Sequence, residues 1–512
     1  MSATNIDRRR FLRFSALAAG VLGTGALTGC ASRASSTTAG TGTDRLRIGI
    51  ADATKSTALD PRAIGYGASL MVLHHVYDSL MFIDGGKYAY GLAESVTPNA
   101  DATKWTIKIR PDAKFHSGRP VTAADVAFSL QTIGAPKSTR SSVYADVDGA
   151  NIKALDKTTL EVPLKRPRGD FREAILVIFS VVFPEGTTDF TKVDGSGPYT
   201  LDTNDGKNVV LLANKDYWGA KPQLTRLDIT RMADAPARLN ALKAGEIDYA
   251  VGISATGAQA ERANQGIELK RGGAANSNGL SFSMNVNLKP FDDPRVRRAV
   301  RLAVDRRALV DNSLLGLATP GNDVIGLGLP GYADLPERTQ DLDGARELFR
   351  QAGVSELTLR IAELVPGLVG AAQLFGQQLG QAGVKLNLEQ VPADTYYADL
   401  TALAKTPFQG FYYLNRPAAV HLAAVTNAKA PFNVTGQGPD HQNRLTEAQS
   451  TVDDTARAAK FADVQRRFHD EGGDVLWGFQ EQIDAARPGV RDVQVRDSLP
   501  LFMKASAAGR QP

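Results

Sequence analysis

Hydrophobic and polar positions follow strand and helix periods through most of the chain. Strict alternation predicts strands over residues 45–51 (RLRIGIA) and 104–110 (KWTIKIR). Apolar residues recurring every three or four positions predict helices over residues 65–82, 122–133 and 294–312. Helical and strand patterns interleave without an internal repeat, which indicates a mixed α/β architecture.

Two helix starts carry clear capping signals. Thr122 stands immediately before an apolar stripe with an Asp in its first turn, as expected of an N-cap residue. Asp293 precedes Pro294, which suits the first position of a helix because proline has no N–H to leave unpaired there. We therefore place the starts of the second and third predicted helices at these residues.

Length and charge limit the classes of function. The chain has 512 residues, 43% of them apolar, so two or three lobes with a sizeable core are feasible. Its net charge is +4, and the first 29 residues supply +3 of it through four arginines against one aspartate. The remaining body is close to neutral, which argues against a nucleic-acid partner and favours a small molecule or a peptide.

The N-terminus has the pattern of an export signal. Arg8 and Arg9 begin the run RRRFLR, and residues 14–27 form an apolar stretch too short to span a membrane. The run resembles the twin-arginine signal R-R-x-F-L-K, with Arg13 in place of the final lysine. We interpret residues 1–29 as a signal peptide that is removed from the mature protein.

Cys30, the only cysteine, follows this signal directly. Leu27-Thr28-Gly29-Cys30 resembles a bacterial lipobox, in which the cysteine is acylated after cleavage. A single cysteine excludes a disulfide within the chain. The small and polar residues that follow suit a flexible tether, so residues 30–44 are expected to hold a folded body at a membrane surface.

The sequence offers no visible catalytic machinery. It has no Gly-x-Ser-x-Gly elbow, no His-Glu-x-x-His and no cysteine nucleophile. The adjacent His74 and His75 point about 100° apart on a helix and cannot bind one ion together, and the other histidines, His116, His421, His441 and His469, have no ligand-like spacing. Each histidine is therefore predicted to be structural. We expect no enzyme activity, no metal site and no cofactor.

Ordered motifs over residues 45 to about 360 resemble one family. Leu59-Asp60-Pro61, the HVYDSL run at residues 75–80 and residues 104–130 (KWTIKIRPDAKFHSGRPVTAADVAFSL) match its early signatures, and GSGPY at 195–199, NKDYWG at 214–219 and FDDPRVRRAVRLAVD at 291–305 follow in order. The chain is identified as a member of the extracytoplasmic solute-binding proteins, family 5, of ABC importers, which includes oligopeptide, dipeptide and nickel receptors.

This resemblance implies a two-lobed periplasmic-binding-protein fold (type II, large three-subdomain class) with a ligand cleft between the lobes. Lobe I would comprise residues 45–80, 185–280 and 472–512, an inserted subdomain residues 81–184, and lobe II residues 281–471. Hinge closure would trap the solute and create the surface that an importer recognises.

A late segment is expected to bind the ligand. Peptide-binding relatives carry W-x-x-D-Y-x-D-P, whose first Asp pairs with the peptide ammonium, and we align it with Tyr412, Tyr413, Asn415 and Arg416. Asn415 then replaces the Asp and removes the counter-ion, while Arg416 reverses the local charge. Two aromatics, an amide and a guanidinium can hold an anionic solute, although the tyrosines could equally be the alternating pair of a strand with Arg416 solvated.

We therefore predict a monomeric substrate-binding lipoprotein of an ABC importer, located outside the cytoplasm on the outer face of the cell membrane or in the periplasm. Its partners would be a peptide or other small solute, the permease subunits and the lipid bilayer. Two alternatives stay open: an ordinary oligopeptide or dipeptide receptor with a shifted ammonium anchor, and a binding or sensory protein without a transport role.

Overall fold

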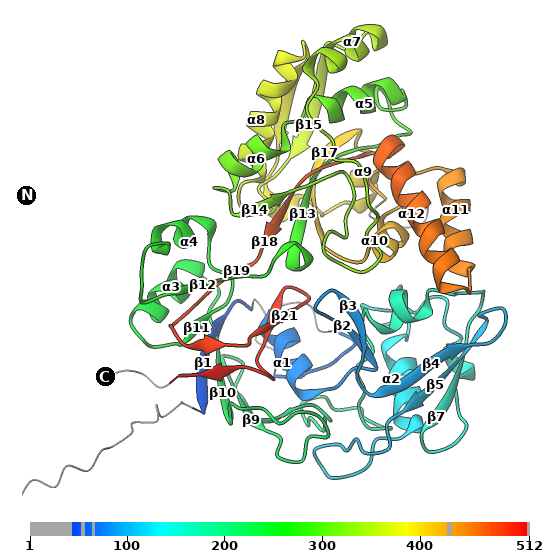
Figure 1. Ribbon diagram of the computed structural model, residues 1–512, viewed down its shortest axis with the longest axis vertical. Helices are drawn as coiled ribbons and strands as arrows, with labels where there is room; N and C mark the ends of the chain where they lie inside the picture. Colours follow the sequence, from blue (N-terminus) through cyan, green and yellow to red (C-terminus); the bar gives the residue numbers. More distant parts are fainter. Residues whose placement is uncertain (1–43, 53–56, 64–66, 427–432, 509–512) are drawn as a thin grey trace, which may run out of the picture. The chain divides into compact units, whose positions relative to one another are not determined.

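The computed structural model describes residues 44–52, 57–63, 67–426 and 433–508 (Figure 1). Arg8, Arg9 and Cys30, with the predicted signal and lipidation site, lie outside these residues. Sheets of seven, six and four strands and several short ribbons organise the described chain.

The seven-stranded sheet has β1 near its centre. β1 is parallel to its neighbours β10 and β11, whereas the outer pairs are antiparallel. Helices α1 (Ala68–Val76), α3 (Ala235–Lys243) and α4 (Ala255–Glu261) belong to this part of the chain. In sheet order the strands are β12 (Glu268–Arg271), β19 (Ile483–Ala486), β11 (Tyr249–Ala250), β1 (Arg45–Ile50), β10 (Arg226–Arg231), β9 (Asn208–Ala213) and β8 (Tyr199–Asn204).

The first predicted helix is shorter than its apolar pattern. α1 ends at Val76, and β2 (Met81–Asp84) follows and pairs with β3 (Lys87–Tyr90). The N–H of Leu80 donates to the carbonyl of Ser180 at 3.0 Å, and the carbonyl of Leu80 accepts from Gly91 at 2.9 Å. These long-range bonds hold residues near 80 in an extended form, so tertiary pairing overrides the local helical period.

The smallest of the three sheets carries helix α2 (Ala123–Ile133), and we refer to this part, residues 81–184, as the insert. Thr122 and Asp125 form a capping box at the start of α2, as the sequence predicted in outline. Trp105 and Ile107 of β5 join the same buried cluster as Ile48 of β1, so one apolar core runs from the insert into the seven-stranded sheet. The elements are β4 (Ala93–Pro98), β5 (Lys104–Ile109), β7 (Thr159–Pro163), β6 (Lys153–Ala154), the 3-10 turn η1 (Gly149–Asn151) and the π-helical turn η2 (Arg172–Leu176).

The six-stranded sheet forms around β13 and has its own core. Phe282, Phe375 and Trp477 stack within that core. Its strands in order are β14 (Ala318–Pro320), β18 (Asp474–Glu481), β13 (Ser277–Met284), β17 (Phe408–Leu414), β15 (Glu356–Ile361) and β16 (Lys385–Gln390). Its helices include α5 (Pro294–Leu302), α6 (Arg306–Ser313), α7 (Leu342–Ala352) and α8 (Leu368–Gln381).

The third predicted helix, residues 294–312, is in fact two helices. α5 starts at Pro294 with Asp293 as its N-cap, as expected, but it ends at Leu302. Asp305 then caps a new helix by accepting from the N–H of Ala308 at 2.9 Å. The apolar stripe continues across this break, which is why the periodicity alone did not reveal it.

Within the described residues, four helices lie between β16 and β18, and short ribbons follow β19. The helices are α9 (Leu400–Ala404), α10 (Ala418–Val425), α11 (Pro439–Ser450) and α12 (Asp454–Glu471), with 3-10 turns η3 (Ala274–Asn276) and η4 (Ala393–Thr395) earlier in the chain. The ribbons pair β20 (Val490–Arg491) with β23 (Ser506–Ala507) and β21 (Gln494–Arg496) with β22 (Leu499–Leu501).

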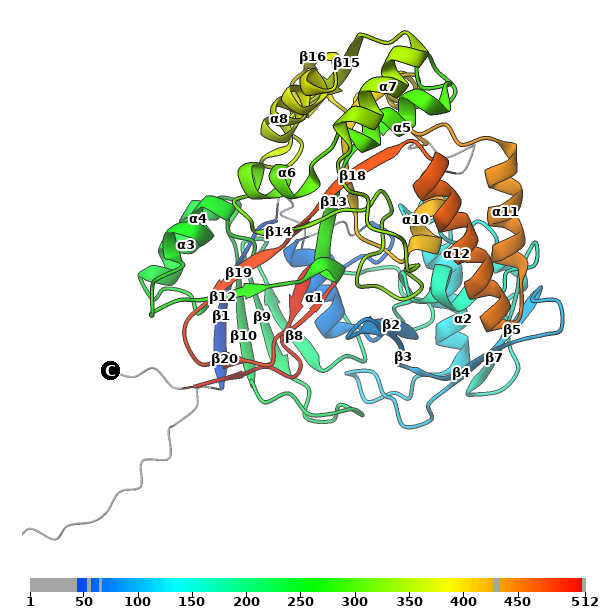
Figure 2. The ribbon, with the colours of Figure 1, turned by 45° about the horizontal axis from the view of Figure 1, so that its top comes forward.

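Two short segments connect the large sheets. One runs from β12 through η3 to β13, and the other runs from β18 to β19 around Gln482 (Figure 2). β18 pairs with β13 in the six-stranded sheet, whereas the boundary expected at residue 472 would have put it in lobe I. If lobes are assigned by the sheet to which each strand belongs, that boundary moves to about residue 482. The lobe limits as a whole stay a prediction.

Candidate functional site

The two connecting segments are bonded to each other. Gly272 donates to the carbonyl of Gln482 at 3.1 Å, and Gln482 donates to the carbonyl of Asn276 at 3.3 Å. Arg271 and Glu481 form an ion pair of 2.8 Å beside them. A pair of short crossovers is the arrangement in which small backbone rotations can turn one sheet relative to the other. We call the residues around this point the junction.

Asn415, a predicted ligand residue, is fully engaged with the backbone at the junction. Its Nδ2 donates to the carbonyls of Ala274 at 2.6 Å and Leu327 at 2.9 Å. Its Oδ1 accepts from the N–H of Gly326 at 2.8 Å. These bonds occupy both donors and one of the two acceptor positions of the amide, and they tie η3 to the loop at residues 326–328. Asn415 therefore holds the junction together in this structure.

Tyr412 and Tyr413 point to opposite faces of β17. Tyr413 is buried, and its hydroxyl lies 3.1 Å from the hydroxyl of Ser283 and 3.2 Å from the carboxylate of Asp474. Burial raises the pKa of Tyr413 well above its usual value, and the negative charge of Asp474 adds to the effect. Tyr412 is partly buried against the core of the six-stranded sheet. The structure thus separates the two tyrosines by strand alternation, one of the two arrangements that the sequence allowed.

Unlike the other predicted site residues, Arg416 keeps its charged group available to a ligand. It lies just beyond β17, is partly exposed, and has no hydrogen bond or ion pair within the part of the chain that the structure describes. Burial lowers the pKa of His421 and the positive charge of Arg416 adds to this, whereas at Asp497 burial raises the pKa and Arg416 opposes the rise, so all three share one electrostatic neighbourhood. A guanidinium in such a position can accept an anionic group in bidentate fashion.

Asp497, in the C-terminal ribbon of β21 and β22, belongs to the same electrostatic neighbourhood. It occupies the tight turn between β21 and β22, where Asp497 and Ser498 both have positive φ. Burial raises its pKa, while Arg496, Arg416 and Arg140 oppose that effect. Even so, 54% of its side-chain surface is accessible. The carboxylate is therefore enclosed by protein and still reachable by a solute.

His74 completes the group and has unused hydrogen-bonding capacity. Its Nε2 lies 3.6 Å from the carboxylate of Asp497. Burial lowers its pKa well below the usual value, and the nearby charges of Arg496 and Arg140 act in the same direction. Neither ring nitrogen has a hydrogen-bond partner in the described structure, although the side chain is almost fully buried. His75, in contrast, bonds to the carbonyl of Met71 and accepts from the N–H of Phe502, as a structural histidine should.

We call Arg416, Asp497, Arg496, Arg140 and His74 the charged cluster. Stacking fixes two of its arginines: Arg140 lies 3.7 Å from the ring centre of Phe179 and Arg496 lies 3.9 Å from that of Phe82. Sequence analysis found only Arg416 of the five. The others are separated from it by long stretches of chain, and a lone Arg or Asp in a loop gives no local signal.

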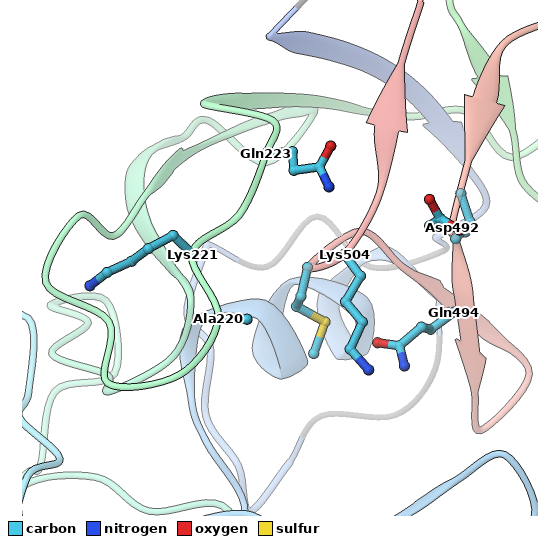
Figure 3. A pocket seen from close by; sticks show the side chains of 8 residues that line it. Ala220, Lys221, Gln223, Asp492, Gln494 and Lys504 are labelled. Carbon is cyan, nitrogen blue, oxygen red and sulfur yellow. The ribbon is translucent and has the colours of Figure 1, made fainter.

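A separate open pocket of about 450 Å³ lies beside the C-terminal ribbons. Figure 3 shows Lys221 and Gln223 on the loop before β10, with the Lys221 side chain pointing away from the other labelled residues, and Asp492, Gln494 and Lys504 on the C-terminal ribbons. Several of these polar groups already have partners: Lys504 pairs with Asp84 at 3.7 Å, and Gln494 donates to the same carboxylate at 3.0 Å. The charged cluster, in which Arg416 has no bonding partner among the described residues, is the better candidate for binding a ligand.

Within the described ranges, no group of three or more His, Cys, Asp or Glu side chains is arranged to hold a metal ion. None of the helices in the same ranges is both long and apolar enough to cross a bilayer.

Comparison with known proteins identifies the family. Residues 87–432 match the bacterial extracellular solute-binding proteins, family 5 Middle. The glutathione-binding protein GsiB of Escherichia coli is 30% identical over 360 residues, which cover 67% of this chain and 69% of the relative.

Solved structures agree in fold. HbpA2 from Haemophilus parasuis has a TM-score of 0.78 and 21% identity, covering 91% of this chain and 100% of its own. DppA from Helicobacter pylori, in complex with the peptide STSA, has a TM-score of 0.69 and 20% identity, covering 91% and 98%. This chain therefore belongs to the bacterial extracellular solute-binding proteins of family 5, the class of ABC-importer receptors that its motifs resemble.

Proposed function

We propose that this protein captures a small anionic or zwitterionic peptide-like solute at the charged cluster and delivers it to an ABC permease, acting as a binding protein and not as an enzyme. The observation that carries the proposal is that Arg416, which has no hydrogen-bond or ion-pair partner among the described residues, lies within electrostatic range of the accessible Asp497 from a different part of the chain. Closure of the two sheets on each other would bring both groups onto one ligand.

Arg416 supplies the anion-binding half of this site. A partly buried guanidinium without a counter-ion has lost some of its hydration, and a ligand carboxylate would restore the missing interaction. Arg140 and Arg496 add positive potential, and their stacking on aromatic rings limits the side-chain freedom lost on binding. A carboxylate-bearing solute fits this half better than a neutral one.

Asp497 supplies the cation-binding half of this site. In the family pattern an Asp at the position of Asn415 would hold the peptide ammonium, and here the amide is committed to the backbone. Asp497 offers the missing negative charge from the turn between β21 and β22. This favours a shifted ammonium anchor, so the ordinary peptide receptor with such an anchor is the second candidate.

The relatives support a peptide-like ligand. One curated relative is described as binding glutathione, a tripeptide with two carboxylates and one ammonium, and one fold relative was solved with a tetrapeptide. A ligand of this chemistry would satisfy Arg416 and Asp497 together. We further propose that acylated Cys30 anchors the mature protein to the membrane after export through the twin-arginine signal.

The test is a binding series on wild type, Arg416→Ala and Asp497→Asn. Reduced glutathione, its fully amidated analogue and a neutral tripeptide are titrated by calorimetry and by thermal unfolding. A true ligand at a hundredfold excess over its Kd stabilises the protein by about 2.7 kcal/mol. Arg416→Ala should weaken a carboxylate ligand by about 2 kcal/mol or more, and Asp497→Asn should weaken ligands with a free ammonium.

Arg298→Ala is the matched control, because Arg298 is an exposed arginine on α5 that belongs neither to the junction bonds nor to the charged cluster. It should bind as wild type does. If both cluster variants bind every wild-type ligand with unchanged affinity, the charged cluster is not the site. If the amidated analogue binds as well as glutathione, the anionic class is wrong even though the family function stands.

A further inference from the structure

The insert touches the helices of the six-stranded part at a second place, away from the junction. Figures 1 and 2 both show the lower ends of α11 and α12 beside the insert. The N–H of Gly169 donates to the carbonyl of Gln449, the penultimate residue of α11, at 2.7 Å, and the N–H of Asp170 reaches the same carbonyl at 3.4 Å. Residues 166–173 thus bond to the end of a helix that precedes β18 in the chain.

Charged side chains extend this contact. Each bond joins the segment 166–173 to the segment 449–457, and we call the two segments together the latch. The bonds are Arg166 Nη2 to Gln449 Oε1 at 3.0 Å, Arg172 Nη2 to Asp454 Oδ1 at 2.7 Å, and Arg457 Nη2 to Glu173 Oε1 at 2.9 Å.

The insert side of the latch is built as a rigid support. Arg168, which is buried, forms a two-point ion pair with Asp170 and a further ion pair with Asp146. Its carbonyl accepts from the indole N–H of Trp105 at 3.0 Å. A loop fixed by buried charges and a core tryptophan presents its N–H groups in one orientation, so little order is lost when the contact forms.

The opposite side is also fixed before it meets the insert. Arg457 Nη1 donates to the carbonyls of Thr451 and Val452, at 3.2 and 2.9 Å, and Asp453 caps α12 by accepting from Ala456 at 2.7 Å. Val452 packs against the apolar cluster of the seven-stranded sheet and insert, and Val420 of α10 is buried within it. The latch is therefore partly apolar as well as polar.

Gly169 allows the two sides to meet. A Cβ placed on Gly169 would lie 1.9 Å from the carbonyl oxygen of Thr451 and 2.6 Å from its carbonyl carbon. No side chain could occupy this space, because the obstacle is the backbone of Thr451 and Val452, which cannot move aside as a flexible side chain could. The close approach exists only while the two segments are in contact, so the glycine serves the contact and not the fold of either side.

We propose that the latch sets the conformational equilibrium of the binding protein by holding the six-stranded part against the insert. This inference rests on the proposed function, since the latch would regulate ligand binding at the same site. The junction is where the two parts turn, and the latch lies away from it, so engaging the latch fixes the angle between them. If the latched conformation is the one that binds, the apparent affinity for the ligand rises in proportion to the fraction of molecules that are latched before binding.

The experiment compares two glycine substitutions in one background. Cys30→Ser removes the native thiol, and spin labels are placed on cysteines substituted for the exposed Lys157 of the insert and the exposed Asn443 of α11. Gly169→Val should lower the latched-to-open ratio by about tenfold or more and broaden the label distances toward longer values. Gly149→Val is the control, because a Cβ there meets no atom within 4 Å. It should reproduce the parent distance distribution.

A charge swap tests the same contact without altering the close backbone approach at Gly169. Asp454→Arg places a third cation beside Arg172 and Arg457 and should open the latch, and the added Arg172→Asp should close it again. Cooperative unfolding monitored by circular dichroism shows that each variant is folded. If folded Gly169→Val or Asp454→Arg keeps the parent distances, the latch does not control the equilibrium. These distances need no ligand, so the result stands independently of the binding series.

Discussion

Replacing Asn415 by Asp tests whether this residue holds the junction or serves the ligand. The substitution keeps the shape and the acceptor for Gly326, but it removes both donors to the carbonyls of Ala274 and Leu327. Each partly buried carbonyl left without a donor costs about 1–3 kcal/mol. The new carboxylate also faces these two oxygens. We expect a loss of about 3 kcal/mol in the free energy of unfolding at neutral pH.

The pH dependence of this variant gives a second signature. The facing carbonyls disfavour the charged form, so the pKa of the introduced Asp should rise above its usual value of about 3.9. A carboxyl whose pKa is raised by folding stabilises the protein below its unfolded pKa and loses that contribution as the pH rises through the folded pKa. The difference between Asn415→Asp and wild type should therefore shrink on acidification, when the protonated acid can again donate one bond.

Urea unfolding followed by circular dichroism at pH 7 and pH 4.5 measures both effects. Asn312→Asp is the control, since Asn312 is exposed on α6 and donates only to the carbonyl of Ala308 in its own helix. It should change the stability by less than about 0.5 kcal/mol. If Asn415→Asp is as stable as wild type and binds ammonium ligands more tightly, Asn415 belongs to the ligand site and the junction role is refuted.

Three further expectations concern export, anchoring and acid stability. Cys30→Ala should abolish acylation, so that the protein no longer sediments with membranes; membrane association equal to wild type would exclude a lipid anchor on this residue. Arg8→Lys with Arg9→Lys should block export, measured by cell fractionation, whereas normal export would indicate the general secretory route. Burial, with a smaller effect of Arg416, lowers the pKa of His421 to about 3. Because an unfolded histidine binds a proton near pH 6.5, wild type should lose stability below that pH. His421→Leu should reduce the loss between pH 7 and pH 5 by about 2 kcal/mol in urea melts, and an unchanged slope would show that His421 is not the group responsible.

Local signals in the sequence were sufficient for individual elements and for the family. The alternation at residues 45–51 and 104–110 and the caps at Thr122 and Asp293 correspond to β1, β5, α2 and α5. These features depend on neighbours within a few positions, so periodicity and capping chemistry predict them. The family followed from ordered motifs, and comparison confirmed it.

Tertiary contacts decided where local patterns failed. The helix expected over residues 65–82 ends at Val76 because distant strands pair with the chain near Leu80. At the candidate site, a lone Asn415 and a lone Asp497 give no local sign of their surroundings. Only the fold commits the first to three backbone groups and brings the second into the field of Arg416. Periodicity records which face of an element is buried, but it carries no information on which distant side chains meet there. By itself, the sequence determined the elements and the family, while the packing of segments far apart in the chain decided which charges remain available to a ligand.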